Sequence, residues 1–335
     1  MEAKMMSDDQ REDLSNDLRV LSKDIQCEDL KIRKEYIKVL EENKEVFSNI
    51  DRNTNIDIEH AIELVENNKI SACPKYRRTP EEHEIIKEEV QKFLAKGIIE
   101  ESESKYVSPV VLVKKKDGGL RFCIDFRRIN NITIPYEYPI PKIDETLDQL
   151  QGAKIFSIMD VESAYNQVNV KEVDRYKTAF YTREGIYQWR KMPFGLINAP
   201  FTFQRIMNKY FSDYIYKFVM IYLDDILIYS KDHKSHVGHL EIILKIIKKI
   251  GFKLNKKKCK LVQNRVEFLG FEIINGKVTI PLQQKMKTMD WKTPKTKKDV
   301  RAFCGFSSFF SKFIINYADK MLGLYDTLRG KKLEL

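Results

Sequence analysis

The stretch Phe218-Val219-Met220-Ile221-Tyr222-Leu223-Asp224-Asp225-Ile226-Leu227-Ile228-Tyr229 decides the fold, because it places two adjacent carboxylates inside an otherwise apolar run. Apolar, β-prone residues on both sides predict a β-hairpin with Asp224 and Asp225 at or beside its tip. Two anions held side by side repel each other, and burial makes ionising both more unfavourable. A divalent cation would remove both penalties, so the pattern favours a metal site. The alternative is a pair of ordinary turn residues.

A third carboxylate ends a separate apolar segment. Residues 155–161, Ile-Phe-Ser-Ile-Met-Asp-Val, predict a strand that ends on Asp160, and residues 162–167 predict a turn that enters a short helix. Hard cations such as Mg²⁺ are bound by a few carboxylates together with substrate phosphates. Two such ions, roughly 3.5–4 Å apart, can hold the attacking and leaving oxygens of a phosphoryl displacement. Asp160 is therefore a candidate third ligand, although a plain turn residue would look the same.

The charge of the chain is unevenly distributed. Its 335 residues can bury a full core and are typical of two or three subdomains, and the formal net charge is +10. Residues 1–72 carry 11 Lys+Arg and 18 Asp+Glu, which leaves 48 and 31 in the rest of the chain. A basic body predicts a polyanionic partner that binds less tightly as salt rises. A merely solvated cationic surface would have the same composition.

The cysteines and histidines do not form a clear metal-binding pattern. The five cysteines are scattered without a Cys-x-x-Cys pair, which predicts reduced intracellular thiols and no zinc site. His233, His236 and His239 could share a metal-binding face, but we expect a solvated helix start. The first residues lack the apolar core of a signal peptide, and no apolar run reaches the length of a membrane span. We expect a soluble protein with no membrane partner.

Capping and turn residues mark further elements. Thr79-Pro80 predicts the start of a helix that ends near Gly97. Segments 107–113 and 121–126 predict a hairpin, and the lysines that precede Asp117-Gly118-Gly119 would either grip phosphate or form a solvated turn. The remaining expectations are a helix near 29–40, a helix over 237–250, strands 265–273 and 277–280, and a helical tail in which 296–317 is the longest helix.

Five blocks follow one another along the chain: 108–118 (Ser-Pro-Val-Val-Leu-Val-Lys-Lys-Lys-Asp-Gly), 121–130 (Arg-Phe-Cys-Ile-Asp-Phe-Arg-Arg-Ile-Asn), 192–200 (Met-Pro-Phe-Gly-Leu-Ile-Asn-Ala-Pro), 222–225 (Tyr-Leu-Asp-Asp) and 268–270 (Phe-Leu-Gly). This ordered set resembles the reverse transcriptase of gypsy-type long-terminal-repeat retrotransposons, a relative of the retroviral enzymes, from about residue 73 to about residue 329. The resemblance implies an α+β, right-hand polymerase. Its fingers and its palm, a small antiparallel sheet with helices, would span 73–275. A basic helical thumb, with the start of the connection, would span 276–335, after an acidic, partly helical N-terminal linker at 1–72.

The resemblance also assigns roles around the carboxylates. It implies an RNA-directed DNA polymerase in which Asp160, Asp224 and Asp225 bind two Mg²⁺ ions, for which Mn²⁺ may substitute. Tyr165 would exclude the 2′-hydroxyl of a ribonucleotide, with a core tyrosine as the alternative. Contacts to the triphosphate would come from the backbone amides of Ser163 and Ala164 and from the side chains of Lys115 and Arg121. Lys258 would donate a proton to pyrophosphate, unless its basic run is merely solvated.

Two turns complete the implied site. Pro193, Phe194 and Gly195 resemble the loop that touches the templating base and the incoming nucleotide. Phe194 replaces a polar retroviral residue, and so would pack or stack. Phe268, Leu269 and Gly270 resemble the turn that positions the primer end.

The resemblance implies an RNA or DNA template with a primer, and deoxynucleoside triphosphates, as partners, and a dimer is compatible with it. It places the protein inside the cell, in cytoplasmic retroelement particles if the element is active. The protease, ribonuclease H and integrase of a full polyprotein do not occur here, and Leu322-Gly323 replaces the usual Lys-Pro. We therefore expect a fragment or a decayed copy with intact polymerase motifs. The alternatives are a catalytically silent nucleic-acid-binding remnant and an RNA-making polymerase, which should lack a bulky residue at position 165.

Overall fold

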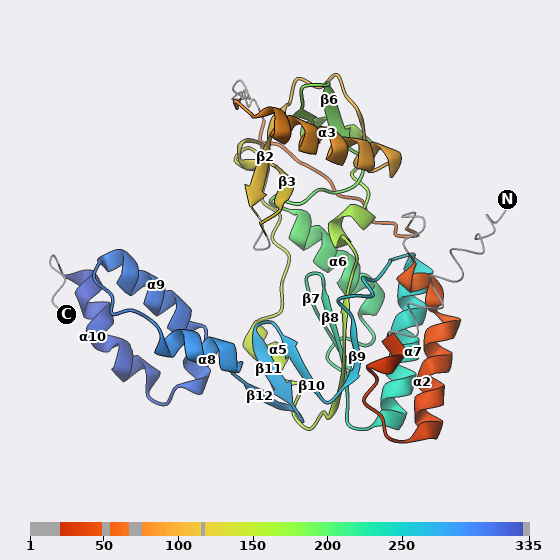
Figure 1. Cartoon of the computed structure of the whole chain (residues 1–335), viewed down its shortest axis with the longest axis vertical. Helices are drawn as coiled ribbons and strands as arrows, with labels where there is room; N and C mark the ends of the chain where they lie inside the picture. Colours follow the sequence, from red (N-terminus) through yellow and green to blue (C-terminus); the bar gives the residue numbers. More distant parts are fainter. Residues whose placement is uncertain (1–20, 49–53, 67–75, 115–117, 331–335) are drawn as a thin grey trace.

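The computed structural model describes residues 21–48, 54–66, 76–114 and 118–330. A central four-stranded sheet carries the two segments that contain Asp160, Asp224 and Asp225, a five-stranded sheet lies above it, and the C-terminal helices extend to one side (Figure 1). This mixed α+β arrangement agrees with the predicted class. Within the described residues, no helix combines the length and the apolarity needed to cross a bilayer.

The central sheet has the strand order β7-β8-β4-β9, with all neighbours antiparallel. Its strands are β4 (Ile155–Asp160), β7 (Val219–Tyr222), β8 (Asp225–Ser230) and β9 (Lys260–Gln263). Side chains alternate across a strand, so Ile155 and Met159 face the main core while Phe156 enters a second core. Both faces of the sheet are therefore buried, which explains why its strands read as nearly continuous apolar runs.

Two helices and a small sheet cover these faces. Helices α6 (Ala199–Phe211) and α7 (His233–Ile250) contribute Phe203 and Leu240 to the main core, while the second core is closed by the β10-β11-β12 sheet and the short helix α5 (Ile143–Asp148). The small sheet comprises β10 (Arg265–Phe268), β11 (Phe271–Ile274) and β12 (Lys277–Thr279). The prediction of one strand over 265–273 is wrong, because Leu269 and Gly270 adopt positive φ values and fold it into a hairpin.

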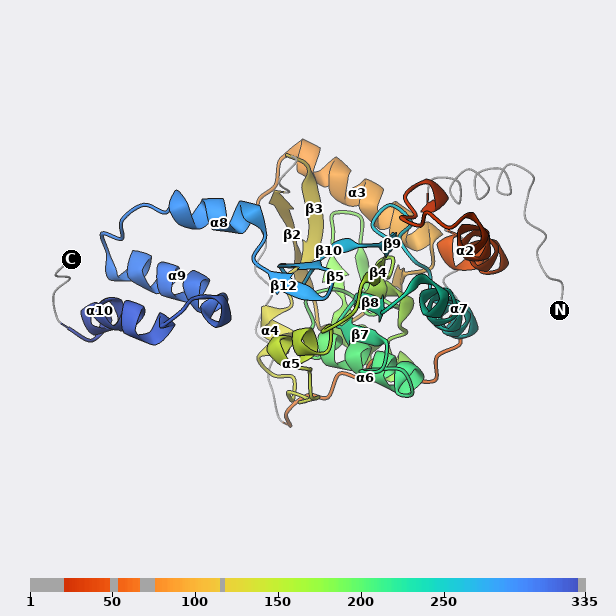
Figure 2. The same cartoon turned by 90° about the horizontal axis from the view of Figure 1, so that it is seen from below.

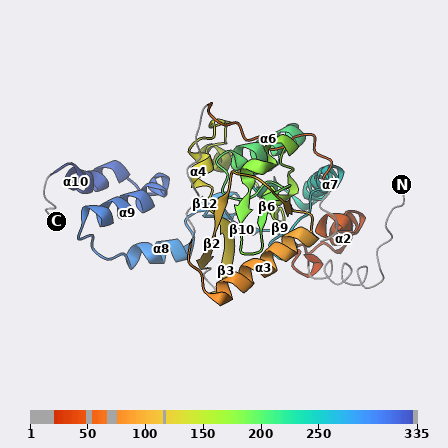
Figure 3. The ribbon, with the colours of Figure 1, turned by 90° about the horizontal axis from the view of Figure 1, so that it is seen from above.

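The upper sheet has the order β1-β6-β5-β2-β3, and α3 (Pro80–Ala95) lies along it (Figure 3). The capping box predicted in part by Thr79 is present, and Phe93 of α3 packs against Trp189 with ring centroids 5.2 Å apart. The predicted hairpin is formed by β2 and β3. The strands are β1 (Ile99–Glu101), β2 (Ser108–Lys114), β3 (Leu120–Ile124), β5 (Phe180–Tyr181) and β6 (Ile186–Trp189), and the adjoining helices are α4 (Arg127–Asn130), η2 (Ala164–Gln167) and η3 (Glu172–Thr178).

Near the N-terminus, α2 (Leu30–Glu42) and the 3₁₀ turn η1 (Lys44–Phe47) pack on α7. Tyr36 is fully buried and donates a hydrogen bond to the carbonyl of His233 at 2.9 Å. The described part of residues 1–72 thus shares the main core. The predicted boundary near residue 72 lies outside the described residues, and the one at 275/276 falls in the β11–β12 turn; both boundaries stay predictions.

The expected solvated start of α7 is wrong at His236. This side chain is fully buried, with Nε2 2.8 Å from Ser157 Oγ and Nδ1 2.7 Å from Ser230 Oγ. Ser230 also contacts His239 Nδ1 at 2.8 Å. Burial lowers the pKa of His236 to about 3, so the ring is neutral and joins α7 to β4 and β8.

The C-terminal helices stand apart from the central sheet in two perpendicular views (Figures 1 and 2). They are α8 (Leu282–Met289), α9 (Lys297–Ser308), the 3₁₀ turn η4 (Ser311–Phe313) and α10 (Tyr317–Arg329). The single long helix expected over 296–317 is wrong, because the chain breaks at Phe309 and Phe310, whose rings pack against Phe271 of β11.

Candidate active site

Three acidic residues lie at one end of the central sheet. Asp160, the last residue of β4, lies directly opposite Asp225, the first residue of β8. Alternation places both side chains on the face that also carries Phe156 and Leu227. Asp224 precedes Asp225 in the two-residue turn after β7. The structure therefore places the acidic residues of the two segments at the same end of the sheet, while their role as metal ligands stays a prediction.

The carboxylates affect one another electrostatically. Burial, together with the charges of Asp224 and Asp160, raises the pKa of Asp225 to about 6, while the charge of Lys258 acts in the opposite direction. A carboxyl group in this range is costly to ionise because it is partly removed from water and faces like charges. Positive charge placed near these carboxylates would therefore stabilise their ionised forms.

Lys258 supplies part of that charge. Its Nζ lies 3.2 Å from Asp160 Oδ2, and the backbone beside it is anchored where the N–H of Asn255 donates to the carbonyl of Asp160 at 2.8 Å. The Lys258 side chain is 65% exposed, so the pair is weak and the ammonium can leave. The sequence-derived candidate Lys258 is thus at the carboxylates, and its role as a proton donor stays a prediction.

The donor chemistry at this end of the sheet fits a hard divalent cation, since all the candidate ligands are carboxylate oxygens. Across the described ranges, no group of three or more His, Cys, Asp or Glu side chains is gathered closely enough to hold an ion as it stands. Binding would therefore require Asp160, Asp224 and Asp225 to draw together and Lys258 to move aside.

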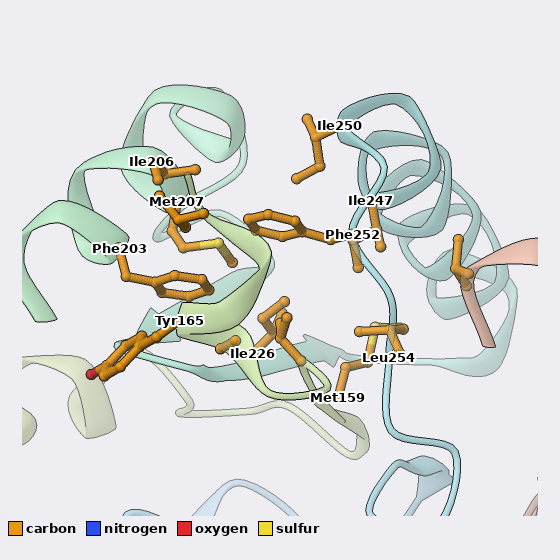
Figure 4. Packing of buried hydrophobic residues seen from close by; sticks show 14 of the residues in the cluster. Met159, Tyr165, Phe203, Ile206, Met207, Ile226, Ile247, Ile250, Phe252 and Leu254 are labelled. Carbon is orange, nitrogen blue, oxygen red and sulfur yellow. The ribbon is translucent and has the colours of Figure 1, made fainter. Parts of the chain in front are cut away.

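Tyr165 lies beside the carboxylates on η2. Its ring is buried between Phe194, with centroids 4.7 Å apart, and Phe203, with centroids 5.8 Å apart. Phe203 in turn stacks on Phe252, so the tyrosine rests on the main core (Figure 4). Burial raises the pKa of Tyr165 to about 12, with a contribution from the charge of Asp224. The core interpretation and the gate interpretation are both compatible with this placement.

Ser163, the residue before η2, has a left-handed conformation with φ of +46°, and Ala164, the first residue of η2, is buried. The chain thus turns sharply between Asp160 and Tyr165. The predicted contacts of the Ser163 and Ala164 amides with a triphosphate stay predictions.

The loop of Pro193, Phe194 and Gly195 is fixed by a residue to which the sequence had given no role. Asn130 of α4 donates from Nδ2 to the carbonyl of Gly195 at 2.8 Å and accepts from the N–H of Ile197 at 3.0 Å. Pro193 is buried, whereas Phe194 is 55% exposed and presents one ring face to Tyr165. The sequence signal for this role was that Asn130 is the last residue of the second block, 121–130.

The remaining candidate site residues lie on other elements. Arg121 is exposed on β3, and Lys115 lies outside the described residues. Phe268 is buried at the end of β10, and Leu269 and Gly270 form the β10–β11 turn, which faces the ring of Phe309. The phosphate and primer roles of these residues stay predictions.

Comparisons with known proteins agree with this arrangement. Residues 113–273 match the family model described as reverse transcriptase (RNA-dependent DNA polymerase). The Tf2-3 and Tf2-7 transposon polyproteins of Schizosaccharomyces pombe are each 34% identical to the chain over 258 residues, which is 77% of this chain and 19% of the polyprotein. The chain therefore spans about a fifth of the length of these curated relatives.

Solved structures share the fold. A foamy viral protease–reverse transcriptase in complex with double-stranded DNA has a TM-score of 0.84 and 19% identity, covering 100% of this chain and 70% of the viral one. The same viral protein with an RNA/DNA hybrid has a TM-score of 0.79 and 19% identity, covering 100% and 45%. At this identity the likeness shows the fold alone, and it confirms the predicted α+β fold class.

Proposed function

Because the chain belongs to the reverse transcriptase family, we propose that it is an RNA-directed DNA polymerase that extends a primer with deoxynucleoside triphosphates. The observation that carries the proposal is the pairing of Asp160 with Asp225 across β4 and β8, with Asp224 in the adjoining turn. Reverse transcriptases generally use divalent metal ions. Two Mg²⁺ ions, or Mn²⁺ in their place, would supply activation of the primer hydroxyl and neutralisation of phosphate charge when bound at these carboxylates.

Two further residues would select the sugar of the nucleotide and transfer a proton. Tyr165, held by Phe194 and Phe203, would exclude a 2′-hydroxyl by the bulk of its ring. Lys258, which is mobile enough to leave Asp160, would hold and then donate the proton that pyrophosphate requires as it departs.

Contacts farther from the reacting atoms would orient the substrates. Arg121 and Lys115 would bind the triphosphate, because a guanidinium offers paired donors to phosphate oxygens and an ammonium adds a mobile charge. The amides of Ser163 and Ala164 would add backbone donors. The loop 193–195 would support the templating base, and the turn 268–270 would support the primer end.

The partners we propose are an RNA or DNA template with a primer, inside the cell in retroelement particles. Residues 73–335 carry 48 Lys+Arg against 31 Asp+Glu, and this basic balance supports a polyanionic partner.

Primer extension on an RNA template tests the proposal directly. The purified 335-residue chain should incorporate deoxynucleotides only with a divalent metal, and Asp224→Asn should lower the rate roughly 10³-fold or more. Asp213→Asn, at an exposed aspartate away from the site, is the matched control and should keep the rate.

A folding measurement separates lost chemistry from lost structure. Asp224→Asn removes a charge that repels Asp225, so its thermal midpoint should equal or exceed that of the wild type. Full synthesis by Asp224→Asn would refute the assignment. Salt-sensitive template-primer binding without incorporation at any metal concentration would favour a silent remnant instead.

A further inference from the structure

The turn that carries Asp224 is held by a side chain from α6. Leu223, the first turn residue, has φ of +55°, a left-handed conformation that is unfavourable for a non-glycine residue. Its N–H donates to Gln204 Oε1 at 2.9 Å, and Gln204 is fully buried. A strained turn thus depends on one buried acceptor for its backbone donor.

The direction of every hydrogen bond behind this contact is fixed. A backbone N–H can only donate, so Gln204 must turn its oxygen to Leu223 and its amide nitrogen away. That nitrogen donates to Asn208 Oδ1 at 2.8 Å, which fixes the amide of Asn208 as well. Asn208 Nδ2 then donates to the hydroxyl oxygen of Tyr138 at 3.1 Å. We call Tyr138, Asn208 and Gln204 the α6 relay.

We infer that the α6 relay positions the carboxylate turn, so that Asn208 and Tyr138 are positioning residues for the proposed polymerase reaction. The inference rests on the proposed function and deepens it. Without an acceptor at position 208, the orientation of the Gln204 amide depends on the Leu223 N–H and on the longer contact from Gln204 Nε2 to the carbonyl of Ile221 at 3.5 Å. The amide then rotates more readily, and the contact with the Leu223 N–H weakens. Asp224 would then sample several positions, and only some of them would suit nucleotidyl transfer.

The outer end of the α6 relay can be mutated without disturbing the buried core. Asn208 and Tyr138 are half-buried and line an open cavity of about 610 Å³ together with Arg205 and Lys209. A substitution at this end therefore leaves the apolar packing of α6 in place, whereas one at Gln204 would not.

Variants at position 208 test the relay. Asn208→Leu removes the acceptor, whereas Asn208→Asp keeps an oxygen for Gln204 and can accept from the Tyr138 hydroxyl. We expect Asn208→Leu to lower the single-turnover incorporation rate about tenfold with nucleotide Kd within about twofold, and Asn208→Asp to stay within about threefold of wild type. Tyr138→Phe should give a loss between these two. Tyr216→Phe, at a tyrosine that is 52% exposed, is the control and should have no effect.

Amide hydrogen exchange provides a readout that does not need activity. The Leu223 N–H should exchange at least about fivefold faster in Asn208→Leu than in Asn208→Asp, with equal thermal midpoints. Equal exchange, or equal rates of synthesis in the two variants, would overturn the inference. If the wild-type chain makes no DNA, the proposed function fails while the exchange experiment still decides whether the relay holds the turn.

Discussion

Replacing Lys258 with methionine should move metal affinity and catalysis in opposite directions. In the structure, Lys258 Nζ lies 3.2 Å from Asp160 Oδ2, so a divalent cation must displace the ammonium before it can use that oxygen. The lysine is 65% exposed and Asp160 is 20% exposed, which places the pair in the range of about 0.2–1 kcal/mol for solvated ion pairs. Removing this competition should tighten metal binding by up to about fivefold.

Catalysis should fall in the same variant if Lys258 protonates the leaving pyrophosphate. Loss of a general acid typically lowers a rate by about 10²-fold or more. Methionine keeps the length and the apolar stem of lysine, so the fold should be unaffected. The expected combination, tighter metal binding with slower chemistry, is opposite to what a simple structural defect would produce.

Mn²⁺ titration followed by electron paramagnetic resonance, without nucleotide, measures the first effect, and single-turnover primer extension measures the second. Lys257→Met is the matched control, because Lys257 is an exposed neighbour of the same charge. Metal affinity in Lys258→Met no higher than in Lys257→Met would show that the ammonium does not compete. A fall in both metal affinity and rate would refute the reasoning altogether.

Three further predictions follow from packing and burial. Phe194→Ala removes the ring whose centroid lies 4.7 Å from that of Tyr165, a contact worth about 0.5–1.5 kcal/mol. Discrimination against ribonucleotides should therefore fall about 2- to 12-fold in a competition assay. An unchanged ratio would mean that Tyr165 does not depend on Phe194 for its position. Burial holds the pKa of His236 at about 3, below its value near 6.5 in the unfolded chain. As pH falls from 6.5 toward 3, the unfolded chain therefore binds a proton that the folded chain does not, and the folded state loses stability over this pH range. Urea unfolding should show this residue contributing about 2 kcal/mol of loss between pH 7 and pH 5, and His236→Gln should flatten the dependence. Gly276→Ala places a Cβ 2.8 Å from a backbone oxygen at φ of +73°, and should lower the free energy of unfolding by about 3 kcal/mol. The control Gly97→Ala, at φ of +61° with no atom within 4 Å of the new Cβ, should lower it by about 1 kcal/mol. Equal losses in the two variants would show that the surrounding backbone relieves the clash.

The sequence predicted the carboxylate end of the sheet because its signals are local. A strand pattern that stops on Asp160, and a hairpin pattern interrupted by Asp224 and Asp225, leave few other places for the charges. The start of α3 was equally predictable from Thr79 and Pro80, which are the N-cap and the first residue of the helix.

The predictions from sequence were wrong where contacts with residues far away in the chain determine the local structure. The β-prone residues of 265–273 predicted one strand, although the resemblance marked Phe268, Leu269 and Gly270 as a turn. The pairing of β11 with both β10 and β12 shows that the chain reverses at Leu269-Gly270. His236 looked like a surface residue because its partners, Ser157 and Ser230, come from strands rather than from its own helix. A polar side chain buried by long-range pairing leaves no local trace.

Three of the seven non-glycine residues with positive φ in the described part of the chain lie in segments that carry candidate site residues. Of the described non-glycine residues with positive φ, Ser163 precedes the Tyr165 turn, Leu223 precedes Asp224, and Leu269 occupies the predicted primer turn. Each such residue would relax elsewhere unless the surrounding contacts held it, since the conformation costs about 1–2 kcal/mol. For Leu223 the holding contact is Gln204, and for Leu269 it is the pairing of β10 with β11. The buried cores on both faces of the central sheet supply the rigidity on which these contacts depend, so the same apolar strands that bring the carboxylates together also keep their turns strained.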